Sequence, residues 1–382
     1  MAQSDPQNEE LLLYDPLFET PPDTVIRDKE GKGFFGKAVV RKTVFIITLL
    51  IFVGVTIGLS FSSLTKERFH YEETDGGYML SECSTTASDT VLTIDVVLSE
   101  DGTREPDKKV VAVRQWAFCC DENVSIIFIG RDVREIANTS FYSCTALQAV
   151  IVDPENPNYL SSDGVLYRKE NGRATELILY PARCDLYRAM LSLGASEPAD
   201  EAAARSFVSD SLRLGEKSEE WREAQQKGYP DKGGYGLTEK ECLSLRSALR
   251  YEIPTGVTRI GEMAFAECGN IYEVEIPEGV REFASMAFFK CAELSSLCLP
   301  DSTEIIGSDA FSYCAKISDL FIPARVSEIG HHAFFGCDGV KTVRMACGES
   351  DMPATDEDWM PKERRLFLHD VPISYGEKRG AE

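Results

Sequence analysis

The feature that most constrains this chain is a motif repeated every 23 residues in its last third. Beginning at Ile253 the chain reads I-P-x-x-V-x-x-I-G-x-x-A-F-x-x-C, and near-copies follow at a constant step. A fixed short period indicates that each unit is one supersecondary element, which buries its apolar face only against its neighbours. The sequence therefore predicts a solenoid, an architecture that usually binds partner molecules and seldom catalyses reactions. The recurring positions are Pro254, Pro277, Pro300 and Pro323, then Phe265, Phe288, Phe311 and Phe334, and finally Cys268, Cys291, Cys314 and Cys337.

The same register extends toward the N-terminus. Phe118 and Phe141 are also 23 residues apart, and apolar residues follow them at the spacings seen after Phe265. Cys144 fills the Cys position of the second copy, whereas Asp121 holds it in the first. Six repeats are therefore readable, two before and four after an interruption.

Within one repeat the pattern predicts a strand followed by a return. From Ile271 to Ile276 apolar residues alternate with Glu273 and Glu275, which is the period of a half-buried strand. Pro277 ends the strand because it has no N–H to donate. The A-F-x-x-C segment is expected to turn the chain back as a short helical or 3-10 piece. Because parallel strands stack about 4.8 Å apart, we expect an internal column of Phe and another of buried Cys.

These motifs resemble the BspA-like leucine-rich repeat family of surface proteins. The resemblance rests on the repeat at 253–345 and on V-D-P-E-N-P-N-Y-L-S-S-D-G-V-L-Y at 152–167, followed by L-I-L-Y-P-A at 177–182. It implies a curved right-handed solenoid with a role in adhesion or ligand binding, and it identifies no ligand. The chain departs from the family pattern at 183–250, where the family would resume with its next repeat almost at once.

The predicted organisation follows from these boundaries. Segment 183–250 is rich in helix-forming residues and ends in a Gly-rich turn, so we expect one or two helices with flexible joints. Such an insertion is either a recognition element or a tolerated loop. The predicted segments are a stem and N-terminal cap (65–106), two repeats with the D-G-V-L-Y segment (107–182), the insertion (183–250), four repeats (251–345) and an acidic C-terminal tail (346–382).

A second strong signal lies near the N-terminus. From Val44 to Leu64 the chain has 21 residues without a charge. At about 1.5 Å per residue this run spans roughly 30 Å, the thickness of the hydrocarbon core of a bilayer. A cleaved signal peptide is disfavoured because 43 residues precede the run and no small-residue cleavage site follows it. The fold class is therefore an α/β leucine-rich-repeat solenoid of short parallel strands plus one transmembrane helix over 43–64.

Basic residues on the N-terminal side set the orientation. The positive-inside rule places 1–42 in the cytosol as a tail, and the repeats outside the cell or in a lumen. Two N-glycosylation sequons agree with this single-pass topology, at Asn123 and Asn138, in repeat positions expected to be exposed. In the tail, Tyr14 and Leu17 form the Y-x-x-Φ pattern that sorting adaptors bind. The plasma membrane and an endomembrane both fit.

Charge and cysteine content restrict the partners. The net charge of −23 lies almost wholly beyond the predicted span, where nucleic-acid phosphates would be repelled. The 12 Cys are an even number, and the predicted topology puts them in an oxidising compartment. Cys184 and Cys242 lie near the two ends of the insertion, so we hypothesise that a disulfide joins them.

A candidate binding face comes from the outward positions of the predicted strands. In the first two repeats these are apolar, at Ile126, Phe128, Ala149 and Ile151, which is more than a solvated face should show. Either this face binds a ligand, or residues 66–106 or the insertion cover it, because solenoid ends need covering. Phe321 and Arg344 hold the equivalent outward positions in the last repeats and complete the candidate face.

No catalytic fingerprint is present in the sequence, and we predict no cofactor and no metal. His331 and His332 occupy repeat positions that favour a surface role. The sequence thus favours a membrane-anchored protein that binds a protein or glycan ligand at the cell surface, not an enzyme. Two alternatives stay open: an endomembrane scaffold or cargo receptor, and a lumenal glycosyltransferase whose metal motif would be Asp356-Glu-Asp358.

Overall fold

The computed structural model describes residues 68–99, 102–226, 236–348, 354–355 and 373–378, and the structural statements below concern these residues. The chain divides after Lys66, and the described residues all belong to the second unit, Glu67–Glu382. The predicted transmembrane helix over 43–64 and the sorting motif lie outside the described residues and stay predictions. Of the helices that are described, none is long and apolar enough to cross a membrane.

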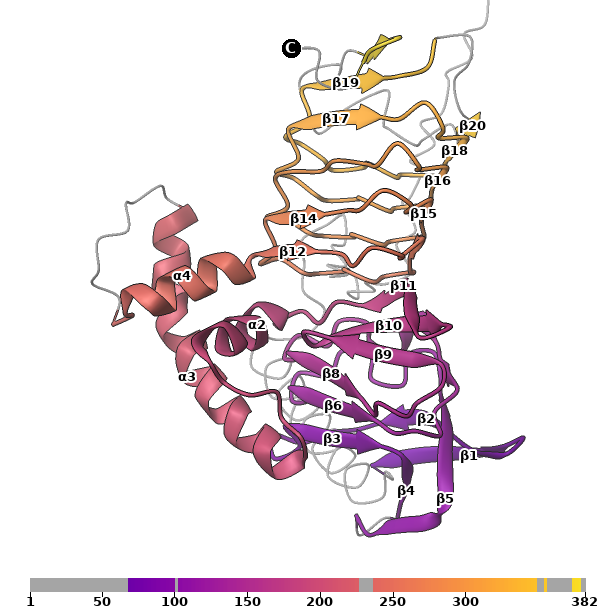
Figure 1. The fold of residues 1–382 in the computed structure, drawn as a ribbon, viewed down its shortest axis with the longest axis vertical. Helices are drawn as coiled ribbons and strands as arrows, with labels where there is room; N and C mark the ends of the chain where they lie inside the picture. The colour runs from indigo at the N-terminus through magenta and orange to yellow at the C-terminus, as the bar shows by residue number, and fades with distance from the viewer. Residues whose placement is uncertain (1–67, 100–101, 227–235, 349–353, 356–372, 379–382) are drawn as a thin grey trace, which may run out of the picture. The chain divides into compact units, whose positions relative to one another are not determined.

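The second unit is a stack of parallel rungs (Figure 1), with successive strands 23 residues apart in its C-terminal half. Two columns of short strands run along this half, whereas the sequence pattern predicts one. The unrecognised column falls on the I-G segment of each repeat, where Ile260, Phe283, Ile306 and Ile329 pair in turn. The first column holds β13 (Arg259–Ile260), β15 (Glu282–Phe283), β16 (Ile305–Ile306) and β18 (Glu328–Ile329), and the second holds β12 (Arg250–Glu252), β14 (Glu273–Glu275), β17 (Asp319–Ile322) and β19 (Thr342–Met345).

Parts of the predicted acidic tail continue both columns. β20 (Ala354–Thr355) pairs in parallel with β18, and β21 (Ile373–Tyr375) pairs in parallel with β19. These short strands cover the last rung and supply partners for its backbone groups.

The N-terminal segment also joins the stack. The end of β5 pairs in parallel with β7 at the repeat step, so this strand belongs to the first rung although it begins before the predicted boundary at residue 106. β3, β6 and β8 form a separate parallel sheet that carries four of the six candidate binding residues, Ile126, Phe128, Ala149 and Ile151. The strands are β1 (Phe69–Thr74), β2 (Gly77–Cys83), β3 (Val91–Ile94), β4 (Val96–Leu98), β5 (Arg104–Val113), β6 (Ile126–Ile129), β7 (Glu135–Ile136) and β8 (Ala149–Val152).

The D-G-V-L-Y segment is an antiparallel insertion into this parallel architecture. It consists of β9 (Tyr159–Ser162), β10 (Val165–Glu170) and β11 (Arg173–Leu179), joined by two-residue turns. Asp163-Gly164 and Asn171-Gly172 make these turns, with φ of 51° and 82° in the first and 51° and 78° in the second. Asp-Gly and Asn-Gly suit such turns because Gly, and to a lesser degree Asn and Asp, accept positive φ. β11 then pairs in parallel with β13 and returns the chain to the stack.

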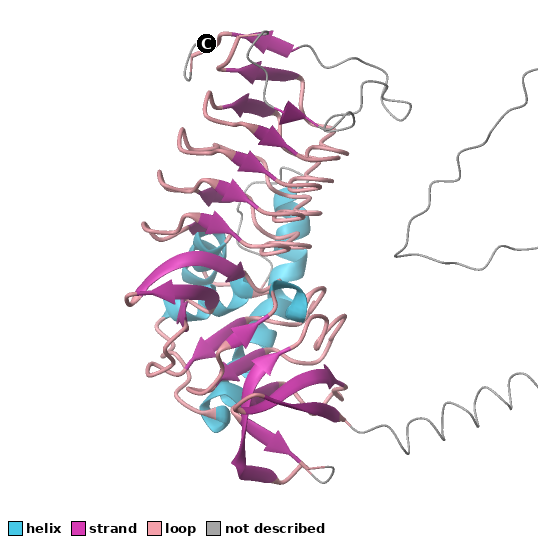
Figure 2. Ribbon diagram, turned by 90° about the vertical axis from the view of Figure 1, so that its right-hand side faces the viewer, coloured by secondary structure: helices cyan, strands magenta, loops and turns pink. Residues whose placement is uncertain are grey.

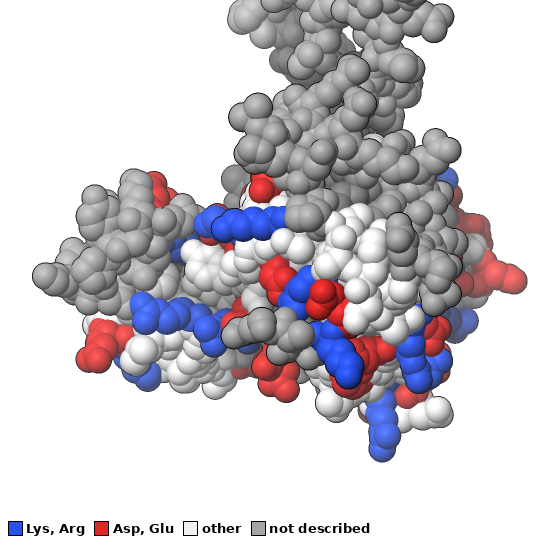
Figure 3. All heavy atoms as spheres, turned by 90° about the horizontal axis from the view of Figure 1, so that it is seen from above, with Lys and Arg blue, Asp and Glu red and all other residues white. Residues whose placement is uncertain are grey.

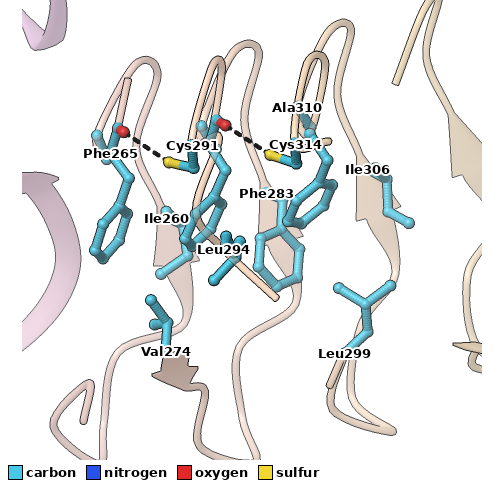
Figure 4. Packing of buried hydrophobic residues seen from close by; sticks show 14 of the residues in the cluster. Ile260, Phe265, Val274, Phe283, Cys291, Leu294, Leu299, Ile306, Ala310 and Cys314 are labelled. Atoms are coloured by element: carbon cyan, nitrogen blue, oxygen red, sulfur yellow. Dashed lines mark hydrogen bonds between the residues drawn. The ribbon is translucent and has the colours of Figure 1, made fainter. Parts of the chain in front are cut away.

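The core confirms the predicted columns of Phe and Cys. Phe265, Phe288 and Phe311 are completely buried and stack with ring centroids 4.5 and 5.2 Å apart. Cys291, Cys314 and Cys337 each donate from the thiol to the carbonyl of the Phe one rung earlier, as Cys291 does to Phe265 at 3.0 Å and Cys314 to Phe288 at 3.1 Å (Figure 4). Cys268, the first of the column, donates instead to the Tyr180 carbonyl at 3.3 Å. Cys is favoured here because it is small and apolar and still satisfies a buried carbonyl.

The returns between rungs differ from the prediction. A 3-10 helix forms only in the second repeat, as η1 (Asn138–Phe141), while the other returns among the described residues are hydrogen-bonded turns. In each of the four C-terminal repeats, the residue two positions before the column Phe has a positive φ, as in Met263 (57°) and Met286 (56°). The turns also bond to one another, since the Phe265 amide donates to the Ala287 carbonyl at 2.8 Å. The turns therefore stack like the strands.

The insertion forms three helices among its described residues, not the one or two predicted: α2 (Cys184–Leu193), α3 (Glu201–Gln226) and α4 (Glu239–Ala248). Gly194 ends α2 in the left-handed conformation (φ 101°), and Thr238 and Glu241 form a capping box at the start of α4. Trp221 is buried within the helical cluster. α2 and α3 lie along the sheet of β3, β6 and β8 (Figures 1 and 2), packed by apolar side chains.

Candidate functional site

A groove of about 850 Å³ lies between the outward face of the β3–β6–β8 sheet and the start of the insertion. Its floor comes from the three strands, one wall from the α2–α3 connection and the first residue of α3, and another wall from β9 and β10. Pockets of this size are the usual place to look for a binding site. The residues that carry the argument below are Thr93, Arg104, Phe128, Ile151, Glu197 and Glu201.

Strand register builds the floor of the groove. Thr93 pairs with Phe128 between β3 and β6, and Phe128 pairs with Ile151 between β6 and β8. Side chains alternate along a strand, so Ile127 and Ile129 point into the core while Phe128 points outward. Phe128 and Ile151 remain half-buried. They form an apolar strip that is still open to the groove.

The insertion covers the other half of the candidate face. Ile126 and Ala149 are completely buried, because Tyr187 of α2 and Phe207 and Val208 of α3 pack over them. The prediction that Ile126 and Ala149 belong to an exposed binding face is wrong. For these two residues the alternative, that the insertion covers the face, is confirmed. The α2–α3 pair thus makes one wall of the groove as well as a cover.

A polar cluster forms part of the groove lining. Glu201 accepts hydrogen bonds from the Thr93 hydroxyl at 2.6 Å and from Arg104 at 3.3 Å. Arg104 also pairs with Asp95. These contacts join β3, β5 and α3, so they fix the first residue of α3 relative to the sheet.

The charge of the groove is acidic. Its lining contains five carboxylates, at Asp95, Asp153, Glu197, Asp200 and Glu201, against two cationic side chains, at Arg104 and Lys169. Asp200 caps α3 by accepting from the Ala203 amide at 2.8 Å, and Glu197 accepts from the Tyr187 hydroxyl at 3.0 Å. Burial, together with the nearby Glu197 carboxylate, raises the pKa of Tyr187. The carboxylates are thus held in place by donors from the protein and still give the groove a negative field.

Acidic and basic side chains are distributed differently at the C-terminal end of the stack. There, Lys and Arg are interspersed with Asp and Glu on the face in view (Figure 3).

Phe321 and Arg344 lie outside the groove. They are register partners on β17 and β19, and the Arg344 guanidinium carbon lies 5.7 Å from the centroid of the Phe321 ring. Arg344 also pairs with Asp319, with a nitrogen–oxygen distance of 2.5 Å. The candidate face predicted as one surface is therefore two separate patches.

The two sequon asparagines are less exposed than predicted. Both are half-buried, and their side-chain amides donate hydrogen bonds: Asn123 to the Thr85 hydroxyl at 3.0 Å and Asn138 to Glu176 at 3.3 Å. The expectation of exposed positions is wrong for this conformation. Glycosylation itself stays a prediction.

The hypothesis of a disulfide between Cys184 and Cys242 is not met in this structure, which forms no disulfide among its twelve cysteines, all of them in described positions. Cys184 lies in the core of the stack and its thiol points to the Asp163 carbonyl. Cys242 packs against the helical cluster of the insertion. The two thiols therefore belong to different packing clusters.

Comparison with known proteins agrees with the architecture. The model of the BspA type leucine rich repeat region matches in six copies, over residues 105–164 and 239–352. The matched segments are therefore similar to BspA-type leucine-rich repeats, and the fold is of the leucine-rich-repeat type. Among curated proteins, none matches this sequence.

Several solved structures are similar to this chain. The pneumococcal vaccine antigen PcpA has 18% identity and a TM-score of 0.46, over 72% of this chain and 51% of that one. A leucine rich cell surface protein from Faecalibacterium prausnitzii has 14% identity and a TM-score of 0.38, over 82% and 95% of the two chains. A leucine-rich repeat protein from Eubacterium ventriosum has 15% identity and a TM-score of 0.40, over 73% and 77%. The match spans about half the length of the pneumococcal antigen.

Sequence reasoning missed the polar residues of the groove. Glu201 and Thr93 are 108 residues apart, and nothing in the leucine-rich repeats marks either as a partner. The one available signal was the apolar pair Phe128 and Ile151, which the structure places on the groove floor.

Proposed function

We propose that this chain is a single-pass membrane protein that presents its leucine-rich repeats at the cell surface for protein binding or adhesion. The 21 uncharged residues from Val44 to Leu64 and the basic residues before them support this topology. In this proposal the chain acts by binding and not by catalysis. Tyr14 and Leu17 would engage a sorting adaptor in the cytosol, and Asn123 and Asn138 would be glycosylated before or during folding.

The observation that carries the proposed binding role is the groove beside the insertion. Its floor offers two half-buried apolar side chains, Phe128 and Ile151, and its lining has more carboxylates than cations. Apolar anchors supply affinity when they are buried by a partner, and complementary charge steers the encounter.

This combination favours a particular ligand. A peptide segment or protein loop with an apolar side chain next to Lys or Arg would satisfy the floor and the lining together. A neutral glycan could use the aromatic ring but would gain little from the carboxylates. We therefore favour a protein ligand with a basic, apolar recognition segment over a glycan.

The binding role is tested with the full chain and a displayed peptide library. We expect enrichment of peptides that combine basic and apolar residues, and loss of binding in the double variant Phe128→Thr/Ile151→Thr. Thr keeps the β-branched shape that suits a strand while removing apolar surface. Phe321→Thr is the matched control, since Phe321 occupies the equivalent strand position outside the groove.

The outcomes separate the possibilities. Binding that survives the double variant, or that is lost equally in Phe321→Thr, would refute the groove as the site. Enrichment of glycans on an array, with no peptide enriched, would refute the preference for a protein ligand. Protease accessibility of N- and C-terminal tags on intact cells tests the topology, because only the C-terminal tag should be cleaved.

A further inference from the structure

Three side chains with metal-ligating atoms meet in the turns of the last two C-terminal repeats. Asp309, His331 and His332 each offer one ligand atom, and these atoms all lie within 4.8 Å of one another. The chain has four His in total, so half of them lie here. None of the three residues lines the groove described above.

The stacking of the repeats produces this meeting. Asp309 and His332 occupy the same position of successive repeats, two residues before Phe311 and Phe334, and both have φ of 53°. Two residues in the same repeat position lie one above the other at the spacing of neighbouring strands, about 4.8 Å. The Asp309 amide donates to the His331 carbonyl at 2.9 Å, which brings His331 into the same cluster.

The backbone around the cluster is held on both sides. The Gly330 amide donates to the Ile306 carbonyl at 2.8 Å, and the Phe311 amide donates to the Ala333 carbonyl at 2.8 Å. A site whose backbone is fixed before binding needs only side-chain rotation to close on an ion. The two imidazoles are already close, with ring centroids 3.7 Å apart.

The environment of the cluster also favours a bound cation. Asp309 and His332 are half-buried, and only His331 is exposed. A poorly hydrated carboxylate gains more from a directly bound cation than one in open water does.

We infer that Asp309, His331 and His332 together bind a divalent transition-metal ion, with Zn²⁺ as the reference ion. Two imidazole nitrogens and one carboxylate oxygen are ligands suited to Zn²⁺, Ni²⁺ or Cu²⁺ and are a poor set for Mg²⁺ or Ca²⁺. In tetrahedral Zn²⁺ sites the ligand bonds are about 2.0–2.2 Å, which places ligand atoms roughly 3.3 Å apart. Side-chain rotations that close the cluster by about 1–2 Å would reach that geometry.

Three protein ligands leave one position of a tetrahedral ion open. Closed structural zinc sites use four protein ligands, whereas three-ligand sites keep a water or accept a donor atom from another molecule. The ion would therefore present an exchangeable coordination position at the surface of the last leucine-rich repeats. Neighbouring repeats carry Glu262 and Met263, or Ser285 and Met286, in the equivalent positions.

The test uses the full chain in detergent, stripped of metal with a chelator. Zn²⁺ binding is measured by calorimetry, and Co²⁺ binding by its visible absorption, which reports coordination number and ligand type. The variants are Asp309→Asn, His331→Ala and His332→Asn, because Asn tolerates the positive φ at the first and third positions. His70→Ala is the control, since it removes an exposed His on β1.

We expect one Zn²⁺ per chain and at least tenfold weaker binding in each of the three variants. His70→Ala should bind within twofold of the unaltered chain, and an excess of Mg²⁺ should not compete. Failure of the chain to bind Zn²⁺, or binding unchanged in all three variants, would overturn the inference. A sulfur-to-cobalt charge-transfer band would overturn it as well, because it would place the ion on cysteine. Thermal unfolding of the metal-free variants separates loss of ligands from loss of fold.

Discussion

Replacing Phe288 tests whether the aromatic column holds the leucine-rich repeats together. The Phe288 ring is completely buried between Phe265 and Phe311, with interplanar angles of 7° and 11° to these two neighbours. Its carbonyl accepts a hydrogen bond from the Cys314 thiol. The side chain therefore joins three successive rungs.

The expected cost follows from these contacts. Truncating a buried Phe to Ala removes apolar contacts and leaves a cavity, which costs about 3–5 kcal/mol. Phe288→Leu retains most of the apolar volume but loses two stacked aromatic pairs, each of which contributes about 0.5–1.5 kcal/mol, and a more distant tilted pair with Phe283. We therefore expect Phe288→Leu to cost about 1–3 kcal/mol, between the unaltered chain and Phe288→Ala.

Urea unfolding of the full chain in non-ionic detergent, followed by circular dichroism, measures both values. With a slope of about 3 kcal/mol per molar urea, the midpoint should fall by about 1–1.7 M in Phe288→Ala at unchanged slope. Phe321→Leu is the matched control, because Phe321 is only half-buried and lies outside the column.

The reasoning about the column would be refuted by either of two results. One is a loss of less than about 2 kcal/mol in Phe288→Ala, which would mean that the rungs repack around the cavity at little cost. The other is equal destabilisation by Phe288→Leu and Phe321→Leu, since the ring pairs would then contribute nothing specific.

Two further predictions concern thiols and the insertion. Cys291 is buried and its pKa is raised by this burial, so this thiol should resist iodoacetamide until the protein unfolds. Cys119 is exposed at the surface, and partial desolvation and a contact with the Cys120 thiol raise its pKa to about 11. Because the thiolate is the reactive form, alkylation of Cys119 should rise about tenfold per pH unit between pH 8 and 10 in a mass-spectrometric assay, and equal rates at both residues would contradict this. Asp185→Asn should cost about 3–5 kcal/mol in thermal unfolding, because Arg222 would keep a buried charge without its partner. A loss under about 1 kcal/mol would show that the insertion is not held by this pair.

The sequence predicted the parts of the fold that its period encodes. A step of 23 residues assigns the same environment to each Phe and Cys position, so burial of Phe265 or Cys291 follows from spacing alone. The turn conformation at Met263 could not be read in the same way. Its positive φ is carried by a non-Gly residue and is maintained by hydrogen bonds to the next repeat. Local propensity contains no such information.

The candidate site was predictable only in part for the same reason. Phe128 and Ile151 were recognisable because apolar residues at outward strand positions need a partner. The insertion folds back over Ile126 and Ala149 and leaves Phe128 on the floor of the groove. This arrangement depends on contacts between distant segments, such as the hydrogen bond between Glu201 and Thr93. The cluster of Asp309 with His331 and His332 likewise became visible only once the turns were stacked.

Hydrogen exchange of the full chain with and without an enriched basic, apolar peptide tests the binding groove most directly. Bound peptide should slow exchange of backbone amides in β3, β6 and β8 and at residues 197–201, which surround Phe128 and Ile151. The same peptide should leave the amides of β17 and β19, beneath Phe321 and Arg344, unchanged. Protection at β17 and β19 with none at the groove would contradict the account.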